Sequence, residues 1–423
     1  MIEQQTRPAP VAPVAKSKGR LKRIVFTAAK IAVAGALLTW VLAKVHWHDF
    51  VELSDGRSLA VMEVRPGAAV DQLLVRESLT DQATWRPASD FQAVPGQSKA
   101  AARYEQVRKL GVASALERMD KLLLALACLG FLISWLIIAV RWWFLLKIQD
   151  IRISLWEAVR LTFLGQFFSV VVPGTVGGDL VKAYYVSKHT TNKAAPLVSV
   201  FVDRVLGMTE LVVMATVMLA IVLIFGIKTV QEVFYPVVAL AVCVVALIGA
   251  FTFLLSARFR KALHLDMIYR RLPIAHHIAA AGDAANLYRK RLGSLIKAIG
   301  VTLGSHVVWI ASIALIGMSL HIQVETYNYF LYVPLIYIVG AVPITPGGAG
   351  VVESLYTESF RSIDPQINLS LVLVLALLAR LMQIFWSIPG AIVAITGPKL
   401  PKAAQMEAEM EKPDPVDGAR QAD

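Results

Sequence analysis

The chain has 423 residues, of which 57% are hydrophobic and only 17% are charged. A soluble domain carries roughly 25% charged residues, so this composition excludes an ordinary soluble domain and favours a membrane protein. The formal net charge of +12 fits that class without a nucleic-acid partner, because basic residues collect in the cytoplasmic loops of membrane proteins. Two cysteines are too few for a disulfide framework.

The first segment, residues 1–23, begins Pro- and Ala-rich and ends in a basic cluster, which predicts a disordered cytoplasmic N-terminus. An apolar run at 24–45 predicts the first membrane span. Residues 46–120 are the long polar stretch of the chain and predict a small extracytoplasmic insert. Within it, the turn signal Asp55-Gly56 between two apolar runs predicts a β-hairpin over 50–64, and residues 99–120 favour helix.

The remaining spans are long apolar runs, which brings the predicted total to about six transmembrane helices. These runs cover about 122–140, 197–225, 234–255, 295–320 and 369–395. Arg141-Trp142-Trp143 predicts a cytoplasmic interface at the end of the second span. The loop at 256–291 is strongly basic, and we expect it and the tail at 399–423, predicted to be disordered, in the cytoplasm.

Two apolar segments do not fit this series because they are short and break at proline. They predict re-entrant helical hairpins over 161–188 and 329–356. Their apices match without a gap at an offset of 170 residues: Val172-Pro173-Gly174-Thr175-Val176-Gly177-Gly178 aligns with Val342-Pro343-Ile344-Thr345-Pro346-Gly347-Gly348. Each half of the chain has the order span, span, hairpin, span, and the second half begins on the opposite side. We therefore expect an all-α polytopic fold with an inverted-topology repeat, which is typical of transporters.

The residue types at the apices favour an anionic ligand. Glycine pairs let the backbone approach a ligand closely, and helices that begin inside the membrane present free N–H groups. We expect Thr175 and Thr345 to cap those helices. Arg204 and Arg380 follow the hairpins in apolar runs, where a charge costs about 2.5–3.5 kcal/mol, and their forked donors suit phosphate.

Several acids accompany these arginines, and the sequence leaves their roles open. Asp179 and Glu353 lie just beyond the apices, and Asp203 and Glu210 lie in the third span. They are candidates for structural ion pairs with Lys182, Arg204 or Arg380, for a cationic headgroup, or for coupling protons. For His306 in the fifth span, a hydrogen-bonded packing role is favoured over proton transfer.

These motifs resemble the signature blocks of the lysylphosphatidylglycerol synthase/flippase membrane-domain family. The blocks are Pro173 to Asp179, Val202-Asp203-Arg204, and Val342 to Glu353. The resemblance implies a flippase-like membrane domain at 121–398 in a prokaryotic inner membrane, with both termini cytoplasmic. Lys182 stands where such proteins often carry arginine, which loses the bidentate fork. No soluble aminoacyl-transferase domain is expected after Lys399, and hence no lysyl-lipid synthesis.

We therefore expect a flippase-like transporter of an anionic or zwitterionic phospholipid or lipid-linked headgroup, not an enzyme. The alternative is a non-transporting membrane partner that binds a lipid for an envelope-lipid enzyme. A coupling proton or ion, a homo-oligomer and an enzyme partner are left open, and no catalytic residue, metal or cofactor is expected. The predicted substrate-binding residues are Pro173, Gly174, Thr175, Gly177, Gly178, Asp179, Lys182, Asp203, Arg204, Pro343, Thr345, Gly347, Gly348, Glu353 and Arg380.

Overall fold

The computed structural model describes a few positions between 32 and 39 and then residues 46–55, 57–77, 81–93, 103–171, 177–190, 194–255, 291–342 and 344–396. The predictions for the two termini, for most of the first span, for the loop at 256–290 and for the apex at 172–176 lie outside the described residues.

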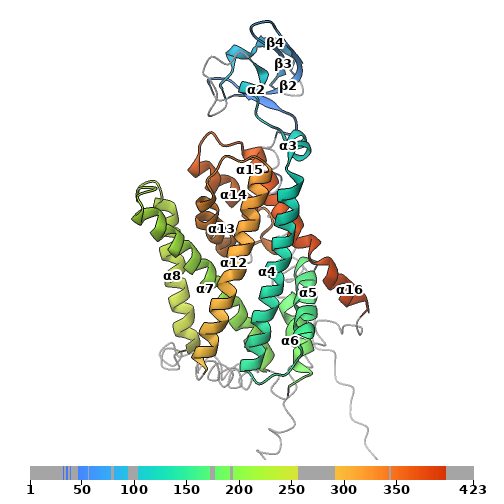
Figure 1. Cartoon of the computed structure of the whole chain (residues 1–423), viewed down its shortest axis with the longest axis vertical. Coiled ribbons are helices and arrows are strands. Elements are labelled where there is room, and N and C mark those ends of the chain that lie inside the picture. The colour runs from blue at the N-terminus through green and yellow to red at the C-terminus, as the bar shows by residue number, and fades with distance from the viewer. Residues whose placement is uncertain are drawn as a thin grey trace, which may run out of the picture.

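The insert is a small β-sheet domain above the helical bundle (Figure 1). Its four strands are antiparallel and lie in chain order: β1 (Phe50–Glu52), β2 (Ser58–Arg65), β3 (Gln72–Arg76) and β4 (Thr84–Pro87). The predicted hairpin is confirmed, because Val51 pairs with Leu59 across the Asp55 turn. The expectation of an all-α chain is wrong here, because alternating apolar residues of β2 and β3 bury one face of the sheet. The insert also contains three short helices, η1 (Ala88–Asp90), α2 (Tyr104–Val107) and α3 (Val112–Arg118).

One carboxylate joins the sheet to the segment that leads back to the bundle. Asp71 accepts hydrogen bonds from the backbone N–H of Tyr104 at 2.9 Å and of Gly67 at 3.2 Å, and from Nη1 of Arg103 at 3.0 Å. These donors, the Tyr104 N–H first, hold the pKa of the Asp71 carboxyl below its ordinary value. The charged form is therefore the one that the folded insert favours.

The insert rests on the turn that precedes the last helices of the bundle. Asn368 Nδ2 donates to the carbonyl of Leu110 at 2.7 Å, and the His46 N–H donates to Ser370 Oγ at 3.0 Å. Val112 and Ala115 of α3 are buried in the same apolar cluster as the bundle helices. The insert is thus packed against the bundle as well as tethered to it.

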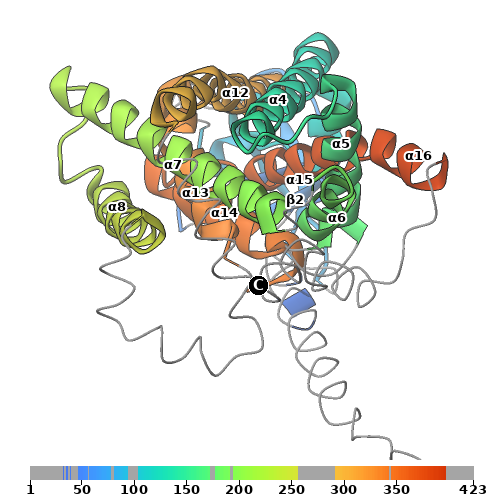
Figure 2. The same ribbon diagram turned by 90° about the horizontal axis from the view of Figure 1, so that it is seen from below.

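The bundle consists of helices that run mostly along its long axis (Figures 1 and 2). They are α4 (Lys121–Ile148), α5 (Leu155–Val171), α6 (Gly177–Ser187), α7 (Ala194–Ile224), α8 (Phe234–Leu255), α12 (Leu292–Ser319), α13 (Thr326–Gly340), η2 (Pro346–Gly348), α14 (Val351–Ile363), α15 (Leu369–Phe385) and α16 (Ile388–Thr396).

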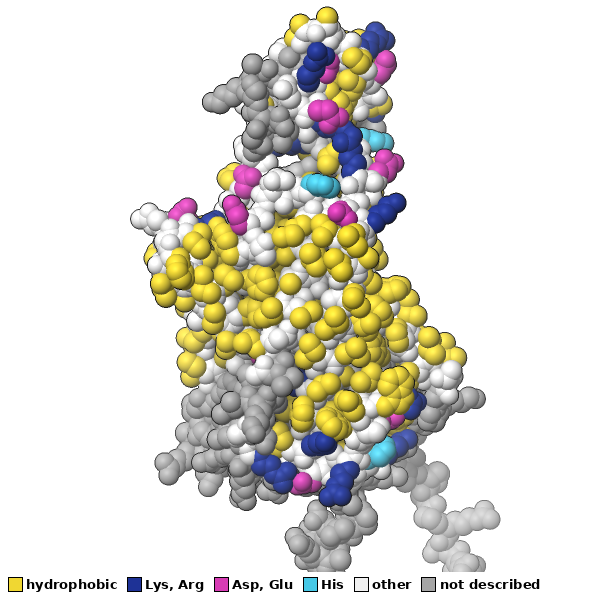
Figure 3. Space-filling model, viewed as in Figure 1, with side chains coloured by type: hydrophobic (Ala, Val, Ile, Leu, Met, Phe, Trp, Pro, Cys, Tyr) yellow, Lys and Arg dark blue, Asp and Glu magenta, His cyan; other side chains and the backbone are white. Residues whose placement is uncertain are grey.

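Three of the described helical segments have the length and the apolar composition of a membrane span. Among the described residues, Lys121–Ile148, Ala195–Ile224 and Leu369–Thr396 are long and apolar enough to cross a bilayer, and Phe234–Gly249 and Leu303–Ser319 are shorter apolar helices. Hydrophobic side chains cover the middle of the face in Figure 3, while charged side chains gather over the insert and at the lower edge. This banding is what a bilayer requires of a protein surface.

One predicted helix boundary is wrong. The helix of the second predicted span does not end at Arg141 but continues as α4 to Ile148, with Arg141 and Trp142 buried. The last span has the predicted bounds, because Leu369–Thr396 is long and apolar enough to cross a bilayer, and a turn at Trp386-Ser387 separates α15 from α16 within it. The α4 prediction failed because an Arg-Trp-Trp run is typical of a membrane interface, yet here it faces the interior of the bundle.

Helices α4 and α12 form an antiparallel pair that lies side by side in both views and runs along the long axis of the bundle (Figures 1 and 2). At one end the Asp120 N–H donates to the carbonyl of Ser319 at 3.1 Å. At the other end Arg291 Nη1 donates to the carbonyl of Ile148 at 2.9 Å. In between, a Cβ on Gly130 would lie 2.1 Å from Ser312 Oγ, so the glycine is what lets these helices approach so closely.

A helical hairpin follows each member of this pair. The hairpin α5–α6 begins after the end of α4, and the hairpin α13–α14 begins after the end of α12. Because α4 and α12 are antiparallel, the two hairpins start from opposite ends of the bundle (Figure 1). Helix α7 then packs on α13 of the other hairpin, and α16 packs on α5. In each half, therefore, a helix that follows the hairpin packs on the first helix of the hairpin in the other half.

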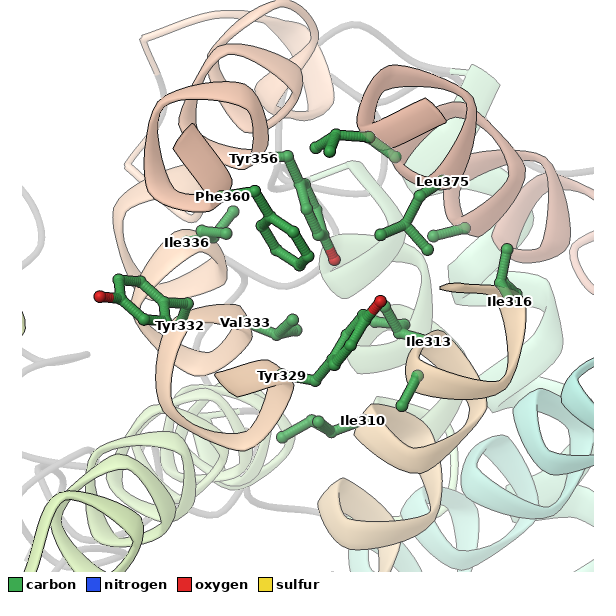
Figure 4. Close-up of a cluster of buried hydrophobic side chains, with 14 of the residues drawn as sticks. Ile310, Ile313, Ile316, Tyr329, Tyr332, Val333, Ile336, Tyr356, Phe360 and Leu375 are labelled. Carbon is green, nitrogen blue, oxygen red and sulfur yellow. The ribbon is translucent and has the colours of Figure 1, made fainter. Parts of the chain in front are cut away.

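The main apolar core lies between α12, α13, α14 and α15 (Figure 4). Tyr329 and Tyr356 are fully buried, and their rings pack edge-on or tilted against Phe360 at centroid distances of 5.3 and 5.9 Å. A Cβ on Gly317 would lie 1.9 Å from the Tyr329 hydroxyl oxygen. This core holds the second hairpin firmly against α12.

A glycine substitution tests the contact between the two halves. A Cβ on Gly390 of α16 would lie 2.0 Å from the carbonyl oxygen of Phe163 of α5. Gly390→Ala should lower the thermal unfolding midpoint in detergent, because overpacking costs about 1–3 kcal/mol. The matched control is Gly304→Ala, where nothing lies within 4 Å and the helix gains stability. Equal midpoints for both variants would contradict this packing.

The Asp71 carboxylate sets a pH dependence for the insert. Because its folded-state pKa is depressed, its contribution is complete above the ordinary pKa of about 3.9 and is lost as the pH falls through the folded value. Asp71→Asn should lower hydrogen-exchange protection of β3 about fivefold at pH 7, equivalent to about 1 kcal/mol, and the difference should vanish in acid. The exposed Asp90→Asn is the control; an equal loss there would contradict the assignment.

Candidate functional site

Charged side chains meet inside the bundle where α4, α6 and α7 pack together. We call Arg141, Asp179, Lys182, Asp203, Arg204 and Glu210 the charge cluster. Arg141 is its centre: it is 4% exposed, its Nε donates to Asp203 Oδ1 at 2.8 Å, and its Nη1 donates to Glu210 Oε2 at 3.1 Å. One arginine therefore neutralises two carboxylates that lie two turns apart on α7.

Lys182 of α6 enters the same cluster from the first hairpin. It is 6% exposed, its Nζ lies 3.9 Å from Asp203 Oδ2, and the ammonium lies 4.1 Å from the centroid of the Trp142 ring. A buried ammonium needs a counter-charge, and an aromatic face stabilises it further. Asp203 and Trp142 supply them, so Asp203 is shared between Arg141 and Lys182.

Arg204 occupies the open edge of the cluster. Its Nε donates to Asp179 Oδ2 at 2.9 Å, and its side chain is 53% exposed while that of Asp179 is 20% exposed. This pair ties the first turn of α6 to α7. It leaves much of the Arg204 guanidinium accessible, whereas Arg141 of α4 is buried.

A second acid–arginine pair follows the second hairpin. Arg380 Nε of α15 donates to Glu353 Oε1 of α14 at 2.5 Å, and Arg380 Nη1 donates to the carbonyl of Gly347 at 3.0 Å. Glu353 is fully buried, and the Arg380 side chain is 27% exposed. In each half, then, an acid near the start of the second hairpin helix pairs with an arginine of the following helix.

The backbone conformation of the turn in the second hairpin requires its glycines, but the predicted capping role of its threonine is not observed. Gly347, Gly348 and Gly350 have φ values of 60°, 68° and 80°, a region that side chains rarely adopt. The expectation that Thr345 caps a helix is wrong: its hydroxyl is buried and makes no capping bond. The Glu353 carboxylate performs that role, because its Oε2 accepts the Gly350 N–H at 2.8 Å.

In the first hairpin, the described glycines allow close packing. Gly178 lies at the start of α6, and a Cβ there would lie 1.9 Å from the carbonyl oxygen of Gly165 on α5. Gly177 begins the helix. The remaining predicted apex residues, Pro173, Gly174, Thr175 and Pro343, lie outside the described residues.

Aromatic and polar side chains in successive contact extend from the charge cluster towards the Glu353–Arg380 pair. His306 of α12 lies beside Glu210, with Nδ1 3.0 Å from Oε2. Its ring meets Trp309 at 6.2 Å, and Trp309 meets Tyr337 of α13 at 4.5 Å, both edge-on. The Tyr337 hydroxyl accepts a hydrogen bond from Gln383 Nε2 at 3.1 Å, one turn after Arg380 on α15.

Residues 105–390 match the family described as the lysylphosphatidylglycerol synthase TM region. The chain belongs to this family. A UPF0104 membrane protein of Pyrococcus horikoshii is 26% identical over 306 residues, covering 67% of this chain and 89% of its own. Another of Archaeoglobus fulgidus is 24% identical over 271 residues, covering 60% and 80%. The family and the apolar helices identify a multi-pass membrane protein.

Sequence reasoning missed Arg141 as a site residue and proposed no contact between His306 and an acid. The signal for Arg141 was its apolar flank, Leu136 to Val140, in which a permanently charged side chain needs a buried partner. Asp203 and Glu210 lie seven residues apart, on one face of α7, and are the acids that such an arginine requires.

Removing the central arginine should destabilise the bundle. Arg141→Met leaves Asp203 and Glu210 without their main counter-charge, and breaking a buried pair in this way costs about 3–5 kcal/mol. Arg160→Met is the matched control, because its ion pair with Glu157 is partly exposed and contributes about 0–1 kcal/mol. Thermal midpoints in nanodiscs should fall sharply for the first variant only. A similar small effect in both would contradict a central role for Arg141.

Proposed function

We propose that the protein is a flippase-like transporter that moves an anionic or zwitterionic phospholipid or lipid-linked headgroup across the inner membrane, with both termini in the cytoplasm. The observation that carries this proposal is the pair of partly exposed arginines, Arg204 and Arg380, each held by an acid next to a hairpin turn. The proposal includes no cofactor and no catalytic step.

The chemistry of these arginines favours a phosphate. In each pair the acid takes the Nε–H, which holds the guanidinium in place, and Arg204 keeps a half-exposed outer edge. A guanidinium offers parallel N–H donors that match phosphate oxygens. An acid-anchored arginine is thus positioned before the headgroup arrives, which reduces the entropic cost of binding.

The arrangement of the halves supports movement rather than binding alone. The hairpins start from opposite ends of the α4–α12 pair, and the interhelical contacts recur when the halves are exchanged. We propose that the two halves form an inverted repeat, which supports alternating access because exchanging the conformations of the halves reverses the side to which the site opens. We propose that Arg204 and Arg380 serve the headgroup in the two access states.

A second candidate is a lipid-binding partner of an envelope-lipid enzyme. The insert favours this candidate, because it is a folded domain at one end of the bundle (Figure 1) and presents exposed apolar side chains such as Trp47 and Met62. The candidates differ in one measurable property: a partner binds the lipid but leaves it in its leaflet.

Proteoliposomes that contain the full chain and fluorescent phosphatidylglycerol test the proposal. The protein should expose inner-leaflet label to an impermeant quencher added outside. Arg204→Lys and Arg380→Lys should each slow this about tenfold to a hundredfold, because a lost bidentate contact costs about 1.5–3 kcal/mol. Arg57→Lys in the exposed turn of the insert is the control. Binding without translocation would contradict the transporter and favour the partner.

A further inference from the structure

The charge cluster contains one carboxyl whose hydrogen bonding is incomplete. Glu210 is 0% exposed, and its Oε2 lies 3.1 Å from Arg141 Nη1 and 3.0 Å from His306 Nδ1. Its other oxygen, Oε1, is buried and has no hydrogen-bond partner, and neither does His306 Nδ1. A buried acceptor without a donor destabilises the folded state. A neutral imidazole carries one N–H, on either nitrogen, whereas a doubly protonated His306 presents an N–H at Nδ1 beside Glu210 in every case.

Among the described charged groups around Glu210, only one can change its protonation near neutral pH. Arg141 faces it from α4 and His306 from α12, while Asp203 on α7 and Lys182 on α6 are joined to it through Arg141. Helices α8 and α13, which also pack on α7, carry no Asp, Glu, Lys, Arg or His within their described bounds. His306 is therefore the group next to Glu210 that can change its charge near neutral pH.

The balance of charges connects this pair with the headgroup. Arg141, Lys182 and Arg204 are the cations of the cluster, and Asp179, Asp203 and Glu210 are its anions. With a neutral His306 the cluster has no net charge. An anionic phosphate at the edge of Arg204 would leave an excess of negative charge in an environment of low dielectric constant, where such an excess is costly.

We propose that Glu210 and His306 together form a proton-binding site, which takes up one proton when an anionic headgroup binds at Arg204. The proposal rests on the proposed function and specifies its coupling ion. The proton comes from solvent and remains within the pair, on the imidazole or shared with the carboxylate. Binding of the proton and of the headgroup is reciprocal, because each raises the affinity of the cluster for the other by the same factor. A proton gradient can then drive the headgroup.

The proton site can be tested without lipid. Imidazole ¹⁵N NMR of the full chain in nanodiscs, compared with His306→Gln, identifies the His306 signals. They should show a change of protonation between about pH 5 and pH 8. His306→Gln retains a hydrogen-bonding side chain and removes the titration, so it keeps the bundle intact. A His306 that stays neutral throughout this range overturns the proposal, whether or not the protein moves lipid.

The linkage is tested by calorimetric titration with short-chain phosphatidylglycerol, in buffers that differ in ionisation enthalpy. The protein should take up about one proton per lipid where His306 is neutral, and its affinity should rise up to about tenfold per pH unit on acidification. His306→Gln should bind the lipid without proton uptake, and the exposed His48→Gln should behave as wild type. Proton uptake that persists in His306→Gln overturns the assignment.

The two experiments together separate the proton site from the proposed function. If His306 titrates but the protein binds no phosphatidylglycerol, the proton site is established, while the proposed function and the linkage are contradicted.

Discussion

The cost of placing charge inside an apolar bundle is the constraint on which the rest of this structure depends. Each isolated charge near the bilayer centre costs at least about 2.5–3.5 kcal/mol, and Arg141, Lys182, Asp203 and Glu210 are all nearly or fully buried. They are tolerated because Arg141 contacts both acids and Asp203 also faces Lys182. The ion pairs therefore require α4, α6 and α7 to pack in one register, and that register positions the more exposed Arg204 beside the first hairpin.

The second constraint is the close antiparallel approach of α4 and α12. Their ends are tied by the Asp120 and Arg291 contacts, and their middle depends on Gly130. Since a hairpin follows each of them, this one pair determines that the hairpins start from opposite ends. The insert adds a third tie at its own end of the bundle, because it holds the turn at Asn368 that begins α15, the helix of Arg380.

Much of this arrangement follows from local sequence patterns. The apolar runs predicted the long helices, Asp55-Gly56 predicted the β-hairpin, and the acids beyond the apices were among the predicted partners of Arg204 and Arg380. Those features depend on neighbours in the chain or on the strong rule that membrane charges need partners. The pairing of Asp179 with Arg204 and of Glu353 with Arg380 selects among the partners that the sequence left open.

The failures are all matters of tertiary context. An arginine beside two tryptophans has the same local pattern at an interface and in a core, so Arg141 was misplaced. The strands β3 and β4 are short, and they are stabilised by the pairing of β3 with β2 and of β4 with β3, and by the Asp71 contacts. Thr345 has the residue type of a cap, but Gly350 and Glu353 form the actual helix start. In each case a residue distant in sequence, or the tertiary packing, decides the outcome.

The central claim is that the two hairpins enter the membrane from opposite sides. Single cysteines test it most directly, in a background in which Cys128 and Cys243 are replaced by serine. One is placed at Asp150, between α4 and α5, and the other at Gln323, between α12 and α13; both positions are exposed. An impermeant maleimide added to intact cells should label Gln323→Cys, and Asp150→Cys should react only after the membrane is opened. Labelling of both positions from the same side would contradict the account.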